Sequence, residues 1–297
     1  MQAIQTSTAI PAEHARSWLL VSGARPDAFA AATTCPADAV ILDLEDGVIP
    51  SGKPAARDAV RAFLTDHQAW VRISPATTAE GDADLLALRG VPGLLGVMLA
   101  KTESAAHIEW AAATLPGIPI VALVESALGI ERAFEIASAA GTIRLAFGTG
   151  DFRRDTLAAA DPAALAYARG RLVVASRAAG IAGPVDGPCL TGEPDLSRAL
   201  ATTRIMGMTG MLCMLDRDTA VVNTGLSPSD DDLDWADHIL DRLGADGEHV
   251  ADGSDLPKLA RAKRIHELAA TFDPVSAARI TSPRLPEPRA HPRSRSG

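Results

Sequence analysis

Short runs of apolar residues alternate along the chain with longer stretches in which apolar residues recur at helical spacing. The short runs predicted to be β-strands are Trp18–Ser22, Val40–Leu44, Trp70–Ile73, Val97–Ala100, Ile120–Val124, Ile143–Phe147, Pro184–Asp186 and Met211–Met214. The predicted amphipathic helices include Lys53–Thr65, Ser104–Ala113, Ile130–Ala139 and Leu165–Ala179. Strands that are apolar on both faces and alternate with helices are typical of a parallel sheet covered by helices. Eight of them predict a closed (β/α)8 TIM barrel. A doubly wound open sheet is the alternative, although no GxGxxG motif follows the first strand.

The pattern changes after Asn223. Ser229 precedes three aspartates and is predicted to cap a helix that ends near Leu243. A last helix is expected over Pro257–Thr271, with proline at its start. The sequence therefore predicts a barrel over residues 14–226 and a C-terminal helical extension over 227–272. Residues 273–297, rich in proline and arginine, are predicted to be a disordered tail.

The composition narrows the class of protein. The chain has 297 residues, 47% of them hydrophobic, and a net charge of −9. Because no basic stripe interrupts this acidic balance, we expect no nucleic-acid partner. The three cysteines lie outside any CxxC pair, which is typical of a reducing compartment. No segment approaches the ~18 apolar residues needed to span a bilayer. We therefore expect a soluble, cytoplasmic protein without a membrane segment.

Polar residues end five consecutive predicted strands: Glu45, Arg72, Lys101, Glu125 and Asp151. They follow one another at intervals of 24 to 29 residues, about one βα unit each. Since the carboxyl ends of parallel barrel strands meet at one rim, we expect these side chains to converge on one site.

The residue types indicate a metal site that also binds an anion. Glu125 and Asp151 are oxygen donors without neighbouring His or Cys, the set that suits Mg²⁺. Glu45 and Asp46 are placed to hold the waters of such a metal. The planar fork of Arg72 suits a carboxylate. The alternative is that these acids only form ion pairs with the arginine and the lysine.

Two features beside these strand ends suggest ligand contacts. Gly150 would allow the backbone to approach a ligand closely. Arg25 follows the first strand, where either a phosphate site or a solvated turn would account for it.

Several motifs resemble the citrate lyase beta-subunit-like family of CoA-ester lyases. They are Arg16-Ser17-Trp18-Leu19, Leu42-Asp43-Leu44-Glu45-Asp46-Gly47-Val48, Lys53 with Arg57, Val71-Arg72-Ile73, Leu123-Val124-Glu125-Ser126-Ala127-Leu128-Gly129, Phe147-Gly148-Thr149-Gly150-Asp151, Tyr167-Ala168-Arg169, Val185-Asp186-Gly187 and Val221-Val222-Asn223. The resemblance covers most of residues 16–240.

The resemblance implies a (β/α)8 barrel in which Glu125 and Asp151 bind Mg²⁺ and Arg72 grips the carboxylate of a 2-keto acid. Members of this family cleave or form malyl-CoA-like or citramalyl-CoA-like thioesters, so a 2-keto acid and an acyl-CoA are the expected small-molecule partners. The related hydroxy-keto-acid aldolases carry histidine where this chain has Asp46, which favours the CoA-ester branch.

Further roles follow from the resemblance. Arg16, Gly150 and Lys101 are assigned to the substrate, and Arg25 and Lys53 to the CoA group. In malyl-CoA lyases a C-terminal segment folds over a neighbouring subunit and supplies an aspartate. Val250-Ala251-Asp252 resembles that segment, so Asp252 is assigned as catalytic and the chain is expected to be a homo-oligomer, a trimer or a hexamer.

One departure from the family concerns the last strand. Relatives usually have Gly-Lys followed by Ile-His-Pro, whereas this chain has Gly210–Asp216 without the lysine, histidine or proline. We interpret this change as bearing on CoA recognition more than on metal binding.

The expected chemistry is an aldol or Claisen-type cleavage. It would leave a thioester enolate that is protonated by Asp252 or by a water held near Glu45 and Asp46. Thioester hydrolysis at the same site, or a non-catalytic subunit of a larger lyase, are the alternatives.

Overall fold

The computed structural model of the chain describes residues 10–190 and 195–273. It divides into two compact units, the first ending at Leu226 and the second beginning at Ser227. The predicted disordered tail lies outside the described residues, except for Asp273.

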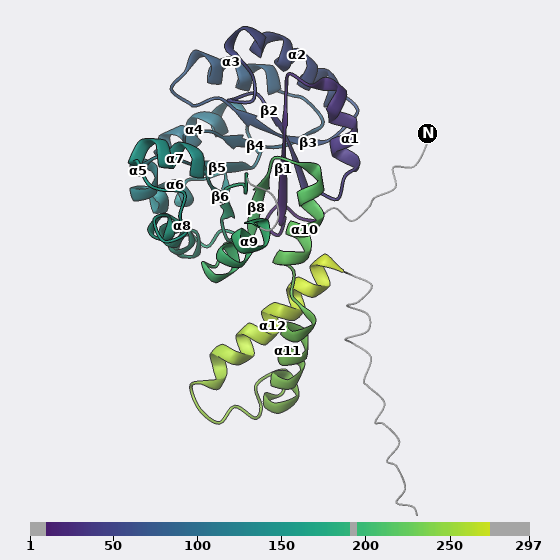
Figure 1. Cartoon of the computed structure of the whole chain (residues 1–297), viewed down its shortest axis with the longest axis vertical. Coiled ribbons are helices and arrows are strands. Elements are labelled where there is room, and N and C mark those ends of the chain that lie inside the picture. The colour runs from purple at the N-terminus through teal and green to yellow at the C-terminus, as the bar shows by residue number, and fades with distance from the viewer. Residues whose placement is uncertain (1–9, 191–194, 274–297) are drawn as a thin grey trace, which may run out of the picture. The chain divides into compact units, whose positions relative to one another are not determined.

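The first unit is a closed barrel of parallel strands in chain order (Figure 1). The prediction of a (β/α)8 barrel is confirmed, and the open sheet is excluded, because β1 pairs with both β2 and β8. The strands are β1 (Ser17–Ser22), β2 (Ala39–Asp43), β3 (Ala69–Ile73), β4 (Leu94–Leu99), β5 (Ile120–Val124), β6 (Thr142–Phe147), β7 (Val185–Asp186) and β8 (Gly210–Cys213).

Helices follow the strands and cover the outside of the barrel (Figure 1). They are η1 (Pro26–Ala28), α1 (Phe29–Thr34), η2 (Pro50–Gly52), α2 (Lys53–Phe63), α3 (Ala79–Leu88), α4 (Ala105–Thr114), α5 (Ala127–Glu131), α6 (Ala133–Ser138), α7 (Thr149–Thr156), α8 (Ala166–Ala179), α9 (Asp195–Ile205) and α10 (Asp216–Leu226). The stretch predicted as one helix over Ile130–Ala139 is interrupted at Arg132, between α5 and α6.

Both faces of the strands are buried, which explains why their sequences are almost continuously apolar. One set of side chains fills the barrel interior, where Trp18 and Trp70 meet edge to face with ring centroids 5.1 Å apart. Gly96 lies against Trp70, whose ring atoms would be 2.2 Å from a Cβ at that position. The other set packs against the helices. The packed interior leaves the strand ends as the place for polar side chains.

Arg144 is fully buried at the end of the barrel where the strands begin. Its guanidinium donates to the carbonyls of Gly183, Ala12 and Ala15 and to the Thr209 hydroxyl, at 2.6 to 2.9 Å. Burial lowers its pKa to about 9. These bonds tie β6 to the segment before β1.

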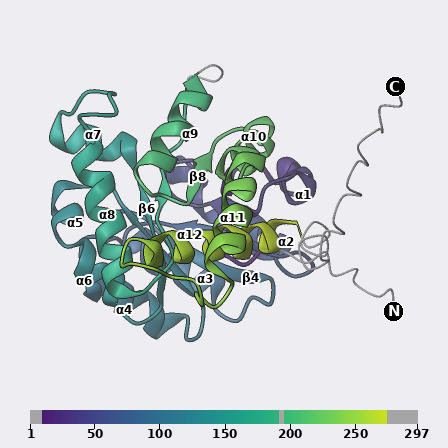
Figure 2. The ribbon, with the colours of Figure 1, turned by 90° about the horizontal axis from the view of Figure 1, so that it is seen from below.

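The second unit is a pair of helices, α11 (Asp230–Leu243) and α12 (Asp255–Phe272). Figures 1 and 2 both show them side by side, with their shared apolar core formed by Ala236, Ile239, Leu243, Leu259, Ala262 and Ile265. Ser229 and Asp232 form a reciprocal capping box at the start of α11. Helix α12 starts two residues before the predicted proline. In the described part of the chain, no helix is both long and apolar enough to cross a membrane.

Candidate metal and substrate site

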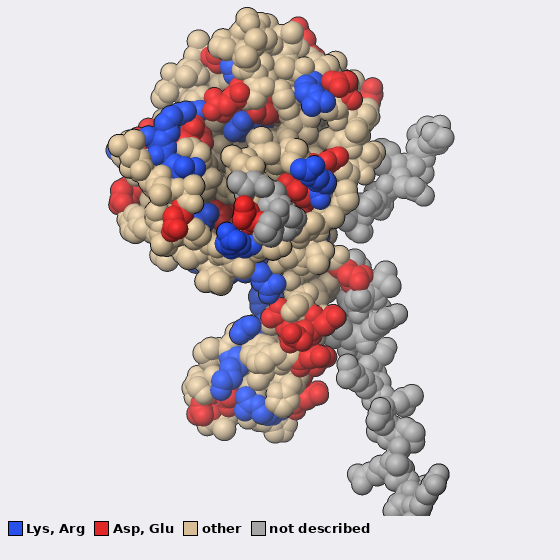
Figure 3. Space-filling model, in the orientation of Figure 1, with Lys and Arg blue, Asp and Glu red and all other residues tan. Residues whose placement is uncertain are grey.

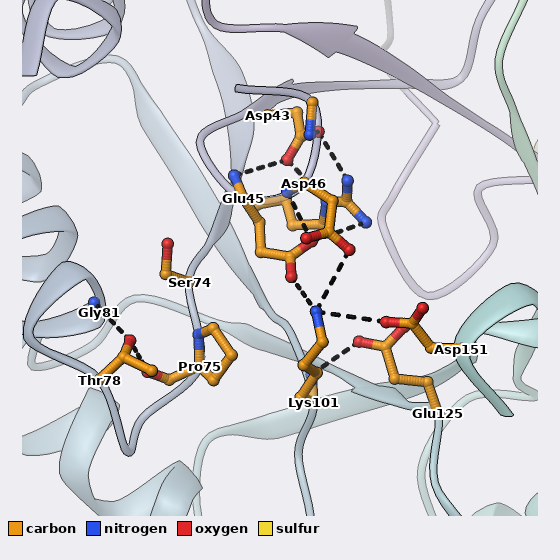
Figure 4. Close-up of polar contacts among 12 residues, drawn as sticks. Asp43, Glu45, Asp46, Ser74, Pro75, Thr78, Gly81, Lys101, Glu125 and Asp151 are labelled. Atoms are coloured by element: carbon orange, nitrogen blue, oxygen red, sulfur yellow. Dashed lines mark hydrogen bonds and ion pairs between the residues drawn. The ribbon is translucent and has the colours of Figure 1, made fainter. Parts of the chain in front are cut away.

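The five polar residues that end β2 to β6 in the sequence lie in one group. Figure 4 shows four of them, Glu45, Lys101, Glu125 and Asp151. Lys101 is at the centre of the group. Its ammonium contacts Glu45 Oε1 and lies 3.3 Å from Asp151 Oδ2, and its backbone N–H donates to Glu125 Oε1 at 2.8 Å. Arg72 Nη1 lies 3.4 Å from Glu45 Oε2.

On the face of the first unit drawn in Figure 3, acidic and basic side chains lie side by side in several places.

Lys101 has an unusual backbone conformation. It is the second residue after the end of β4. Its φ of 50° is one of two positive values among the described non-glycine residues. Such a conformation costs about 1–2 kcal/mol for a side chain without a local hydrogen bond. It places the N–H of Lys101 against Glu125, and so the loop after β4 helps to hold a carboxylate from β5.

Glu125 is buried at the end of β5, with 7% of its surface exposed. Burial raises the pKa of its carboxyl to about 7, and the charges of Asp151 and Glu45 add to this effect, while Lys101 opposes it. Gly148 lies directly against this carboxylate, because a Cβ there would be 2.2 Å from Oε2. Glycine is therefore the residue that leaves room for Glu125.

Asp151 is in the first turn of α7, where the helix dipole favours a negative charge. Its Oδ1 pairs with Arg154 at 3.0 Å. Its Oδ2 is buried and accepts no hydrogen bond from the described residues. A cavity of about 400 Å³ opens here, and both Glu125 and Asp151 line it together with Lys101.

This pair of carboxylates fits a hard divalent cation. Both supply oxygen donors, and the orphaned Oδ2 of Asp151 gives the ion a ligand that no hydrogen bond satisfies. Among the described residues, no group of three or more His, Cys, Asp or Glu side chains has the spacing of a metal site. Mg²⁺ keeps several waters and is commonly held through one or two carboxylates, so Glu125 and Asp151 would suffice.

Arg72 is held by Asp43, a residue that the sequence analysis did not assign. Its Nε and Nη2 donate to the two oxygens of Asp43 at 2.7 and 2.6 Å. Burial acts against the charge of Arg72, but these bonds raise its pKa above the ordinary value. Asp43 also accepts the N–H groups of Glu45 and Gly47, at 2.9 and 2.8 Å. An aspartate inside an otherwise apolar strand was the signal for this role.

Glu45 and Asp46 differ in environment although they are adjacent. Glu45 is buried, and this burial raises the pKa of its carboxyl, against the effects of Arg72 and Lys101. The side chain of Asp46 is 62% exposed. Burial opposes the shift there, but the charge of Lys101, 3.3 Å away, lowers the pKa of Asp46.

Lys53 lies beneath this loop and is buried. Its ammonium donates to the carbonyls of Leu44 and Glu45, at 2.5 and 3.0 Å, and to Ser74 Oγ at 3.2 Å. The three bonds join the segments that follow β2 and β3. All three donors of Lys53 are thus used within the protein.

Arg16 and Arg25 lie apart from this group, whereas Gly150 directly precedes Asp151 in α7. Arg16 directly precedes β1, so it lies at the amino ends of the strands, whereas the site lies at their carboxyl ends. Its Nε donates to Asp38 Oδ2 at 2.8 Å. Arg25 is 68% exposed after β1, 3.7 Å from Asp27. Gly150 borders a second cavity of about 450 Å³, and a Cβ added to it would meet no atom within 4 Å.

Asp252 belongs to the second unit, in the loop between α11 and α12. It accepts the N–H of Ser254 at 2.7 Å, and this bonding to Ser254 lowers its pKa. The catalytic role assigned to Asp252 requires that this loop reach the site of a neighbouring subunit.

Comparisons with known proteins agree with the geometry. Residues 16–186 match the family model described as HpcH/HpaI aldolase/citrate lyase, and residues 231–273 match the one described as HpcH/HpaI aldolase C-terminal domain. The chain belongs to the HpcH/HpaI aldolase/citrate lyase family. The resemblance inferred from the sequence motifs is therefore confirmed.

Relatives within the HpcH/HpaI aldolase/citrate lyase family carry more than one name. A citrate lyase subunit beta-like protein of Mycobacterium tuberculosis is 35% identical over 237 residues, which cover 75% of this chain and 83% of that protein. A (3S)-malyl-CoA thioesterase of Cereibacter sphaeroides is 29% identical over 234 residues, covering 76% and 81%. The crystal structure of protein CitE from M. tuberculosis, in complex with magnesium, acetoacetate and coenzyme A, has a TM-score of 0.73 and 31% identity, covering 87% and 99%.

The residues that depart from the HpcH/HpaI pattern lie on β8 and directly after it. Met211, at the position of the usual lysine, is 1% exposed and lies beside Asp186 on β7. It packs against Leu19 and Leu196 outside the barrel wall. Met214 and Leu215, beyond the end of β8, are 47% and 44% exposed.

Proposed function

We propose that this protein is a Mg²⁺-dependent carbon–carbon lyase. It would cleave, or form, a 3-hydroxyacyl-CoA such as a malyl-CoA- or citramalyl-CoA-like thioester, with a 2-keto acid and an acyl-CoA as the other side of the reaction. The observation that carries the proposal is the pair Glu125 and Asp151, which line one cavity together with Lys101. The Oδ2 atom of Asp151 is buried there and accepts no hydrogen bond from the described residues.

Glu125 and Asp151 would hold the metal. When bound, Mg²⁺ supplies a Lewis acid that polarises the oxygen at the cleaved carbon. The N–H of Lys101 fixes Glu125, and the dipole of α7 favours the charge of Asp151. Both carboxylates are therefore oriented before any ligand arrives, which avoids reorganisation during the reaction.

Arg72 would bind the carboxylate of the keto-acid half. Asp43 occupies its Nε and Nη2, so Nη1, which lies 3.4 Å from Glu45 Oε2, is the nitrogen left to donate to a substrate oxygen. Because Asp43 holds the guanidinium in place, little side-chain entropy is lost on binding. This arrangement supports recognition of a carboxylate next to the metal.

Glu45 is the residue best suited to move the first proton. Its pKa is raised by burial, which brings a carboxyl closer to the range in which it works as a general base. Glu45 would take the proton of the 3-hydroxyl as the carbon–carbon bond breaks, and the bonding electrons would pass to the thioester enolate. Asp252, or a water near Asp46, would then give a proton to the enolate carbon.

Asp252 would come from a neighbouring subunit. The two-helix unit that carries it matches the C-terminal domain model of the family over residues 231–273. We propose a homo-oligomer, a trimer or a hexamer, in which a monomer lacks this acid and is inactive.

Alanine variants at Glu125 and Asp151 test the proposal. With malyl-CoA or citramalyl-CoA as substrate, each should lower kcat/KM by at least about 100-fold, since each removes a group that stabilises developing charge through the metal. Matched variants at Glu103, which lines the same cavity, should have a smaller effect. Retained Mg²⁺-dependent turnover in E125A or D151A would disprove the assigned site.

Thioester hydrolysis is the second candidate, because one relative is named a (3S)-malyl-CoA thioesterase. Product analysis separates the two reactions. A lyase releases glyoxylate or pyruvate together with an acyl-CoA. A thioesterase releases the hydroxy acid and free CoA.

A further inference from the structure

Lys101 is the cation that three acidic residues share. Its ammonium contacts Glu45 Oε1 and lies 3.3 Å from both Asp46 Oδ2 and Asp151 Oδ2. Figure 4 shows the ammonium between the loop after β2 and the start of α7. One side chain from the segment after β4 therefore bridges carboxylates from the loop after β2 and from the first turn of α7.

The backbone of Lys101 is held by local geometry, whereas its side chain is held only through the ion pairs of its ammonium. The left-handed φ of 50° and the bond from its N–H to Glu125 hold the main chain. The side chain is 31% exposed and ends in a flexible four-carbon stem. A change of partner thus requires only rotation of the side chain.

The contact with Asp151 is the one that a metal ion would disturb. Lys101 pairs with Oδ2 of Asp151, whereas Arg154 pairs with Oδ1. Oδ2 accepts no hydrogen bond within the described part of the chain. A divalent cation on this oxygen would repel an ammonium 3.3 Å away. Glu45 and Asp46 offer the ammonium two other carboxylates on the far side of the site.

We infer that Lys101 is an internal counter-ion of the metal site. Its ammonium neutralises Asp151 while no divalent cation is present, and it moves wholly to Glu45 and Asp46 when the cation binds. Metal loading would then break the bridge between the β2 loop and α7. This inference rests on the proposed metal site at Glu125 and Asp151.

The test is calorimetric titration of Mg²⁺ into the full-length protein without substrate. K101N removes the charge, and asparagine tolerates the left-handed backbone. K101R keeps the charge. K101N should bind Mg²⁺ more tightly than wild type, on the order of tenfold, because the repulsion between the ammonium and the metal is gone. K101R should bind within about twofold of wild type.

A crystal structure of the wild-type protein with Mg²⁺ gives a second readout that does not depend on any variant. The distance from Lys101 Nζ to Asp151 Oδ2 should increase beyond ion-pair range while the contact with Glu45 is kept. Equal or weaker Mg²⁺ binding by K101N, or an intact Lys101–Asp151 pair beside a bound metal, would overturn the inference while leaving the lyase proposal intact. A wild-type protein that binds no Mg²⁺ would refute both.

Discussion

Arg72 and Asp43, on adjacent strands of the barrel, are joined by two parallel hydrogen bonds of 2.7 and 2.6 Å. The residues are paired in register between β2 and β3, so the strand ladder itself sets this geometry. The pair is nearly buried, with 13% and 4% of the side-chain surface exposed. Asp43 therefore determines how the guanidinium of Arg72 is presented to the site.

The D43N variant should disturb both stability and turnover. Breaking a buried ion pair by removing one charge costs about 3–5 kcal/mol, so the free energy of unfolding should fall by about this amount. kcat/KM for the CoA ester should fall as well, since Arg72 loses its orientation. Urea unfolding and steady-state kinetics measure the two effects. D27N, which removes a carboxylate exposed beside Arg25, should leave stability unchanged. A D43N protein as stable as wild type would contradict the role given to this pair.

Gly148 should be intolerant of any side chain. In G148A the new Cβ would be placed 2.2 Å from Glu125 Oε2, so this carboxylate must move. We expect a loss of stability of about 1–3 kcal/mol, as for other overpacked positions, and a weaker Mg²⁺ affinity. The matched control is G170A, in the interior of α8, where the nearest atom to a Cβ is 3.8 Å away. Mg²⁺ binding that is equal in G148A and G170A would show that Glu125 is not the metal ligand.

The strand pattern predicted the barrel because burial of both strand faces leaves a continuous apolar run. The spacing of Glu45, Lys101 and Glu125 also predicted their shared rim, since each βα unit returns the chain to the same end of the barrel. The spacing of polar residues along the chain does not show which residues face each other on adjacent strands. It therefore could not predict that Asp43 would hold Arg72.

Lys53 shows a second limit of the sequence analysis. The resemblance to the CoA-ester lyases assigned Lys53 to the CoA group. In the folded chain it turns under the loop after β2, where tertiary contacts use all of its donors. The sequence pattern predicts the helix that Lys53 begins, but it does not predict the direction in which the Lys53 side chain points.

Lys53 and Arg25 should therefore respond differently to substitution. K53M leaves the buried carbonyls of Leu44 and Glu45 without a donor, and it should lower the free energy of unfolding by about 1–3 kcal/mol.

R25A removes an exposed side chain and should leave the unfolding temperature unchanged. If Arg25 binds a CoA phosphate, R25A should raise KM for the CoA ester, with a smaller effect at high salt. A raised KM in K53M without loss of stability would support the assignment of Lys53 to CoA.

The raised pKa of Glu125 predicts a pH dependence of stability in the metal-free protein. Its folded pKa of about 7 lies above the ordinary value of 4.5, so the folded state binds the proton more tightly than the unfolded state. The stability from this group is fully present below about pH 4.5 and is lost as the pH rises through 7.

Unfolding of the wild-type protein in EDTA should thus become easier as the pH rises across this window, and the change should be smaller in E125Q. Mg²⁺ affinity should rise over the same window, because the metal requires the carboxylate form. A pH profile identical in wild type and E125Q would rule out this titration.

Mixed oligomers test whether Asp252 acts in a neighbouring subunit. D252N and E125Q assemblies should each be inactive, since every site lacks one of the two groups. In a randomly mixed assembly, a D252N subunit with intact Glu125 can receive Asp252 from an E125Q neighbour. About a quarter of the sites should then be complete if the contact is heterologous.

The mixing experiment separates the two placements of Asp252 because only one of them can give recovery. Co-expression of the two variants, with different purification tags, ensures that the assemblies contain both chains. If Asp252 serves the barrel of its own chain, no subunit in the mixture has both groups and activity stays at the level of the single variants. A mixture of D252N and wild type is the control, because it reports any loss of activity that mixing itself causes.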